Sequence, residues 1–148
     1  MSLKLLLLFL HLLCAAAWLG CILVEVVYER SIDTSLAMRR FVSQLHWRTD
    51  LSIEGPALLG VSITGGALLS MAPASPLLSV KIAFGGLAVL SNLICILLVK
   101  KRLDAACASE QQRYERLDHL QHKVGALVLI GVLVALVLGG YLFSRGQF

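Results

Sequence analysis

The sequence has few charged residues and no close pair of cysteines. Only 15% of its 148 residues are Asp, Glu, Lys or Arg, whereas 58% are hydrophobic and the mean hydropathy is +0.84. This balance excludes a water-soluble domain of ordinary composition. The four cysteines form no C-x-x-C motif, so we expect them to be small apolar residues within the helices.

Long apolar stretches are the main feature of the sequence. Crossing a hydrocarbon core of about 30 Å takes roughly 20 residues in a helix. Stretches of that length are Leu3–Tyr28, Leu51–Ala72, Leu77–Val99 and Val124–Phe143. We therefore predict an all-α integral membrane protein with one domain over residues 1–148, built as an antiparallel up-down four-helix bundle. The first stretch continues past the alanines at 15–17, so we expect a retained span and no cleaved signal peptide.

The basic residues predict the orientation in the membrane. With four spans, both termini and the connection between the second and third spans share one side, which holds Lys4, Lys81 and Arg145. The other side holds Arg30, Arg39, Arg40, Arg48, Lys100, Lys101, Arg102, Arg113, Arg116 and Lys123. The positive-inside rule then places these longer loops in the cytoplasm and both termini outside. The second and fourth helices are expected to extend into the cytoplasm. The basic pI of about 9.1 is thus explained by the membrane topology, without a nucleic-acid partner. The expected partner is the lipid bilayer.

The first apolar stretch carries its polar and large side chains on one helix face. The residues that recur there at heptad spacing are His11, Cys14, Trp18, Cys21, Glu25 and Tyr28. A histidine and a glutamate inside a span are costly unless they face protein, water or a ligand. We therefore predict that this face lies inside the bundle.

The second helix is predicted to start near Asp33–Ser35 and to run unbroken into the second span. His46, Asp50 and Glu54 follow one another at intervals of four residues and so share one face. Pro56 is expected to bend the helix just beyond them.

The fourth helix is expected to follow a loop over residues 105–109, with Ser109 as its N-cap. It presents Asp118, His119 and His122 where it enters the membrane. His46 and His119 each remain open between a ligand and a solvated residue, whereas His122 adjoins the apolar run and is the stronger ligand candidate.

Three uses suit the cluster of acidic and histidine residues at the cytoplasmic end. His46 and His122 could be the axial ligands of one b-type haem. Alternatively, carboxylates and histidine could bind a transition-metal ion, the candidate ligands being Glu25, Asp50, Glu54 and His122. The third use is a structural ion-pair network, with the members Glu25, His46, Arg48, Glu54 and Lys123.

The other half of the bundle has its own candidates. His11 either donates a hydrogen bond across the bundle or ligates a second haem or metal ion, with Cys14 one turn away as a soft ligand. Lys81 extends toward the outer headgroups or lies near that site. Gly60 and Gly65 allow close approach by a helix or a flat ligand, and surplus glycine faces permit a homodimer.

Several of these residues resemble a known family. His11 precedes Ala-Ala-Ala-Trp18-Leu-Gly, Pro56 and Thr64-Gly65 lie in the second span, and Val-Lys81 begins the third. This pattern is similar to small bacterial four-span proteins related to the copper-resistance D (CopD) membrane domain and to HemJ-type protoporphyrinogen oxidases. The resemblance implies a bundle that binds b-type haem, with His11 and Lys81 as site residues.

The leading hypothesis from the sequence is therefore a haem-b-binding or related redox protein of the inner membrane, acting with a membrane redox partner. A metal-binding permease or accessory protein for copper or iron is the second. A structural or assembly subunit without a cofactor is the third.

Overall fold

The computed structural model describes residues 2–31 and 35–146, which are helical apart from short connections. Four helices are each long and apolar enough to cross a membrane. They are α1 (Leu3–Arg30), a continuous helix over Leu36–Leu69, α4 (Pro76–Cys107) and α5 (Gln111–Ser144). The prediction of an all-α protein with four helices of membrane-spanning length is confirmed.

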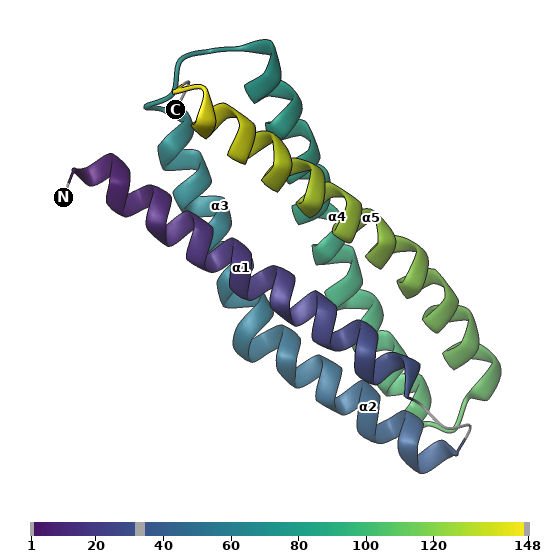
Figure 1. Ribbon diagram of the computed structural model, residues 1–148. Helices are drawn as coiled ribbons and strands as arrows, with labels where there is room; N and C mark the ends of the chain where they lie inside the picture. Colours follow the sequence, from purple (N-terminus) through teal and green to yellow (C-terminus); the bar gives the residue numbers. More distant parts are fainter. Residues whose placement is uncertain (1, 32–34, 147–148) are drawn as a thin grey trace.

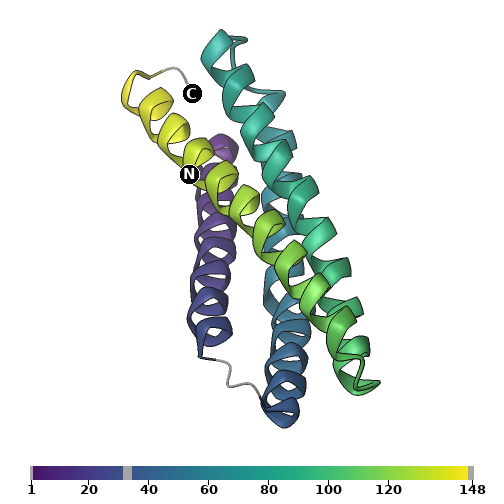
Figure 2. The same ribbon diagram turned by 90° about the vertical axis from the view of Figure 1, so that its right-hand side faces the viewer.

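Successive helices run in opposite directions (Figure 1). One end of the bundle holds the C-terminal end of α1, the start of the second long helix and the turn between α4 and α5, and we call it the basic end. The opposite end holds the two termini and the connection before α4, and we call it the termini end. Helices α4 and α5 lie side by side in both views (Figures 1 and 2), as do α1 and the second long helix.

Serine side chains begin three of the helices. The Oγ atoms of Ser2, Ser35 and Ser75 accept hydrogen bonds from backbone N–H groups three residues later, at 3.4, 3.3 and 3.2 Å. Each bond satisfies an amide at a helix start that has no partner within the helix. Ser35 is the last residue of the predicted start of the second helix, and Asp33 lies outside the described residues.

The turn between α4 and α5 differs from the prediction. Residues 105–107 are helical, so the predicted loop over 105–109 and the N-cap role of Ser109 are wrong. Ser109 has φ of 60°, and the Glu110 N–H donates to the Ala105 carbonyl at 3.0 Å. Ser109 thus ends α4 in the left-handed conformation of a Schellman motif, and Glu110 is the N-cap of α5. The third spanning helix therefore also extends well past its apolar stretch, which the sequence had suggested only for the second and fourth.

The second long helix contains a π-helical segment. Helix α2 (Leu36–Thr49) leads into the segment Asp50–Glu54, which leads into α3 (Gly55–Leu69). The Gly55 N–H donates to the Asp50 carbonyl, five residues back. A Cβ atom at Gly55 would lie 2.9 Å from that carbonyl oxygen, so glycine fits here best. The predicted unbroken helix is confirmed, and its irregularity lies directly before Pro56.

An apolar cluster fills the middle of the bundle, and its members are Trp18, Ile22, Ala57, Leu58, Ala88, Val128 and Val132. The outer surface is also apolar, because large side chains such as Leu59, Ile63 and Val137 are 64 to 72% exposed. A bundle with an apolar exterior fits a lipid environment, where helix association depends on close packing and polar contacts.

Helices α4 and α5 pack closely together at Gly131. A Cβ atom there would lie 2.8 Å from the Phe84 carbonyl oxygen and 2.9 Å from the Ala88 Cβ. We expect Gly131→Ala to destabilise the protein by about 1–3 kcal/mol, because the two backbones must move apart. SDS-induced unfolding in detergent micelles measures the change. Gly140→Ala is the control, since nothing lies within 4 Å of its Cβ position, and equal effects of both variants would contradict the prediction.

Candidate functional site

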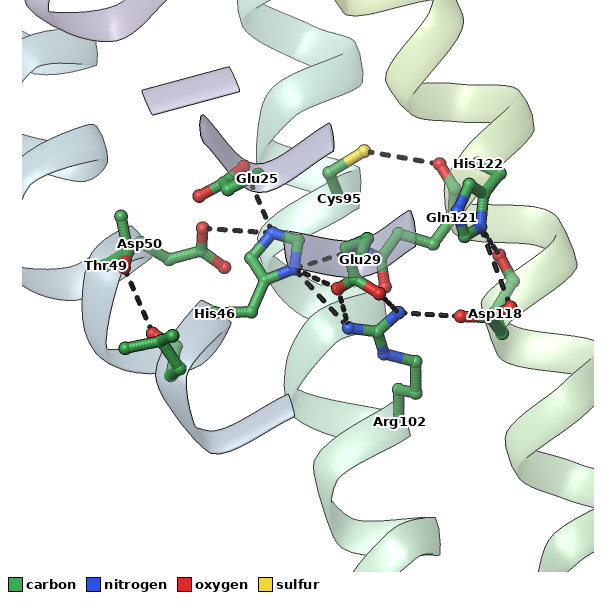
Figure 3. A network of polar contacts seen from close by, with 11 residues as sticks. Glu25, Glu29, His46, Thr49, Asp50, Cys95, Arg102, Asp118, Gln121 and His122 are labelled. Atoms are coloured by element: carbon green, nitrogen blue, oxygen red, sulfur yellow. Dashed lines mark hydrogen bonds and ion pairs between the residues drawn. The ribbon is translucent and has the colours of Figure 1, made fainter. Parts of the chain in front are cut away.

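Charged and polar side chains from all four long helices meet near the basic end (Figure 3). We call this group the basic-end cluster. Its members are Glu25 and Glu29 from α1, His46, Asp50 and Glu54 from the second long helix, Arg102 from α4, and Asp118 and Gln121 from α5. The prediction that α1 turns its heptad face into the bundle is confirmed, because Trp18, Cys21 and Glu25 are buried.

His46 lies at the centre of the cluster and is only 5% exposed. Its Nδ1 atom is 2.7 Å from Glu29 Oε1. On the opposite edge of the ring, Nε2 is 3.2 Å from Glu25 Oε2 and 3.7 Å from Asp50 Oδ1. Both ring nitrogens of His46 therefore face carboxylates, as Figure 3 shows, and the Tyr28 ring meets the imidazole edge-on at 5.7 Å between centroids.

Arg102 is the buried cation of the cluster. Its side chain is fully buried, contacts both carboxylate oxygens of Glu29, and places Nη1 2.7 Å from Asp118 Oδ1. The guanidinium also lies 5.7 Å from the centre of the Tyr114 ring. One side chain thus joins α1, α4 and α5, and the fork geometry of arginine suits such a multiple contact.

Arg48 and Lys123, the basic residues predicted for the ion-pair network, are both exposed. Arg102 takes their place because it lies on the packed face of α4. The signal in the sequence is the recurrence of Asn92, Cys95, Val99, Arg102 and Ala106 at intervals of three and four residues, which places them on one helix face. In the sequence, Arg102 stands out only as one of the basic residues that predict the orientation in the membrane.

Three carboxyl groups of the cluster keep an oxygen without a hydrogen-bond partner. These atoms are Glu25 Oε1, Asp50 Oδ2 and Glu54 Oε2, and the three residues are 8, 2 and 3% exposed. The other oxygen of Glu54 accepts a hydrogen bond from the indole Nε1 of Trp18 at 3.2 Å. Trp18 therefore packs in the central apolar cluster and also anchors a carboxyl group of the basic-end cluster.

A metal ion could be held by atoms that already lie together. Glu25, His46 and Asp50 each offer one ligand atom, and these atoms are all within 4.8 Å of one another. The Glu54 carboxyl lies beside those of Glu25 and Asp50. Oxygen and imidazole donors of this kind suit divalent first-row metals.

The two histidines of α5 lie outside this group. His119 and His122 are exposed, and His122 Nδ1 is 2.8 Å from the carbonyl of Asp118 on its own helix. His122 thus faces Asp118, and both nitrogens of His46 face carboxylates. The structure therefore does not turn His46 and His122 toward each other as the axial pair of a haem. Haem binding stays a prediction.

His11 and Lys81 lie half-buried toward the termini end. The ring Nδ1 of His11 is 3.0 Å from Thr64 Oγ1. Because that hydroxyl donates to the Gly60 carbonyl, it accepts from the imidazole, which is the hydrogen bond across the bundle foreseen as one alternative. The methylene chain of Lys81 packs against Gly139 of α5. A ligand role for either residue stays a prediction.

Comparison with known proteins finds no matching protein-family model, curated protein or solved structure. The resemblance to CopD and HemJ proteins therefore stays a prediction from short motifs.

Removing the buried cation tests the cluster as a structural unit. We expect Arg102→Met to destabilise the protein by about 3–5 kcal/mol, because the buried Glu29 carboxylate loses its contacts with the guanidinium and Asp118 loses its ion pair. Arg113→Met is the matched control, since Arg113 forms an exposed pair with Glu110 at 2.9 Å of the kind that contributes about 0–1 kcal/mol. SDS-induced unfolding of both variants gives the comparison, and a small effect of Arg102→Met would show that the pairing is not needed.

Proposed function

We propose that the protein is a multi-pass membrane protein that binds a divalent transition-metal ion inside its helix bundle. The ligands are Glu25, His46 and Asp50, with Glu54 beside them. The observation that carries the proposal is the gathering of three buried carboxyl groups, each with an unpartnered oxygen, around one imidazole.

The charges of the cluster support this proposal. Arg102 compensates Glu29 and also contacts Asp118. Among the described residues, the basic side chain within ion-pair distance of Glu25 and Asp50 is that of His46. Burying an ionised carboxylate costs several kcal/mol unless charge and hydrogen bonds compensate it. A bound divalent cation supplies the missing positive charge and occupies the free oxygens.

The donor set indicates the class of metal. Carboxylate oxygen and imidazole nitrogen suit Mn²⁺, Fe²⁺ and Zn²⁺, whereas soft thiolate or thioether ligands select Cu⁺. We therefore favour iron, manganese or zinc over copper for this site. A static binding or accessory role follows most directly, since the apolar cluster around Trp18 packs between the site and the termini end.

The other two hypotheses predict different measurements. Haem b would produce a Soret absorption band and dithionite-dependent α and β bands. A purely structural cluster would bind neither metal nor haem.

We also propose that the basic end lies in the cytoplasm of a bacterial cell, that the helices at that end extend beyond the membrane, and that both termini lie outside. The supporting observation is the distribution of lysine and arginine along the chain. This orientation places the metal site in the cytoplasmic half of the bundle.

The orientation is testable through Cys107, an exposed free cysteine at the basic end. In intact cells we expect a membrane-impermeant maleimide to leave Cys107 unlabelled until the inner membrane is permeabilised. The control is Ala74→Cys combined with Cys107→Ser, which places the thiol in the exposed turn at the termini end and should be labelled directly. The reverse labelling pattern would invert the proposed orientation.

Metal binding is testable with the purified full-length protein in detergent, stripped by a chelator and titrated with Co²⁺. We expect each chain to bind one ion with visible d–d absorption. Asp50→Asn should weaken binding by at least the roughly 10- to 100-fold typical of losing an outer hydrogen-bond partner. Asp104→Asn is the matched control, because Asp104 is exposed and pairs with Lys100 at 2.7 Å. Absence of binding by the wild type, or equal binding by both variants, would refute this site.

A further inference from the structure

We infer that Glu29 is a positioning residue that fixes the tautomer of His46, so that the Nε2 lone pair points at the metal. This inference rests on the proposed metal site and adds to it the residue that orients its only imidazole ligand. Glu29 itself lies on the far edge of the ring from Glu25 and Asp50, as Figure 3 shows.

The contacts of Nδ1 show that this nitrogen carries a proton. Nδ1 lies 2.7 Å from Glu29 Oε1, a distance typical of a charge-assisted hydrogen bond. A carboxylate only accepts hydrogen bonds, so Nδ1 must be the donor. The Arg102 Nη2 and Gln121 Nε2 atoms also approach Nδ1, but both are at 3.4 Å, and the Glu29 contact is the shorter by a wide margin.

The opposite nitrogen is aimed at the proposed ligand set. Nε2 faces Glu25 Oε2 at 3.2 Å and Asp50 Oδ1 at 3.7 Å. When a metal ion replaces the proton on Nε2, which is released to solvent, the imidazole keeps its proton on Nδ1 and presents the Nε2 lone pair to an ion held by those two carboxylates. Metal-bound histidines usually donate their other N–H to a carboxylate or carbonyl, which sets the ring orientation and raises ligand basicity.

Arg102 holds Glu29 in the required place. Its guanidinium contacts both Glu29 oxygens, so the carboxylate cannot rotate away from His46 without breaking that pair. Asp118 contacts the same guanidinium from α5 at 2.7 Å. The successive contacts Asp118–Arg102–Glu29–His46 therefore extend across the bundle and fix the orientation of the imidazole.

The direct test is ¹⁵N NMR of the full-length, Zn²⁺-loaded protein in detergent, with labelled histidine and with His46→Gln used to assign its signals. We expect wild-type His46 to be protonated at Nδ1 and bound to zinc through Nε2. Zinc bound at Nδ1, or no zinc signal on His46 in a protein that binds the ion, would overturn the inference and leave a metal site without it. A wild type that binds no Zn²⁺ would instead remove the proposed function, and the inference with it.

The variant Glu29→Gln tests the energetic consequence. We expect its Zn²⁺ affinity to fall by roughly 10- to 100-fold, with mixed His46 tautomers in the ¹⁵N spectrum. Glu115→Gln makes the same chemical change at an exposed carboxylate, which pairs with Arg39 at 3.4 Å, and should leave both readouts unchanged. Unaltered affinity and tautomer in folded Glu29→Gln would overturn the inference. If this variant does not fold, the wild-type spectrum still decides it.

Discussion

The contact of Arg102 with Glu29, and of Glu29 with His46, is the interaction on which the basic end of the bundle depends. Apolar faces give little preference for one helix neighbour over another in lipid, where close packing and polar contacts determine association. The guanidinium of Arg102 is fully buried and joins α1, α4 and α5, and His46 adds α2 through Glu29. These charges cannot be exposed to lipid singly without large cost, so the helices must meet in this register.

The backbone of the second long helix places the proposed metal ligands on its buried face, beside this charge pairing. In a regular α-helix, residues four apart drift slowly around the axis. The π-helical segment Asp50–Glu54 interrupts that drift, and His46, Asp50 and Glu54 are all buried. Gly55 allows the wider turn because its missing Cβ leaves room beside the Asp50 carbonyl. Segments of this type often occur at functional sites, which agrees with the carboxyl groups gathered here.

Hydropathy and periodicity predicted much of the fold and only part of the site. The four helices follow from apolar length, and the buried face of α1 follows from the heptad spacing of Trp18 and Glu25. Arg102 was missed because a buried arginine near a helix end looks the same in sequence as one that marks orientation. Ser109 was misassigned because its hydroxyl suits an N-cap, while its left-handed backbone depends on how α4 ends. His122 was grouped with His46 because both lie at a similar distance from the apolar stretch of their helix. In the structure, α5 turns His122 to the exposed side, whereas His46 is buried.

The two ends of the bundle use different means of holding helices together. Toward the termini end, small residues bring backbones close, and the hydroxyl of Thr64 joins His11 to the second long helix. At the basic end, the ion pairs of Arg102, Glu29 and His46 hold the helices together. Trp18 belongs to both regions, because its ring packs in the central apolar cluster while its N–H holds Glu54. Any ion passing from the carboxyl groups toward the termini end would have to displace this ring and part the helices around it. For the proposed metal ion, the packing of Trp18 therefore favours a closed site over an open path through the bundle.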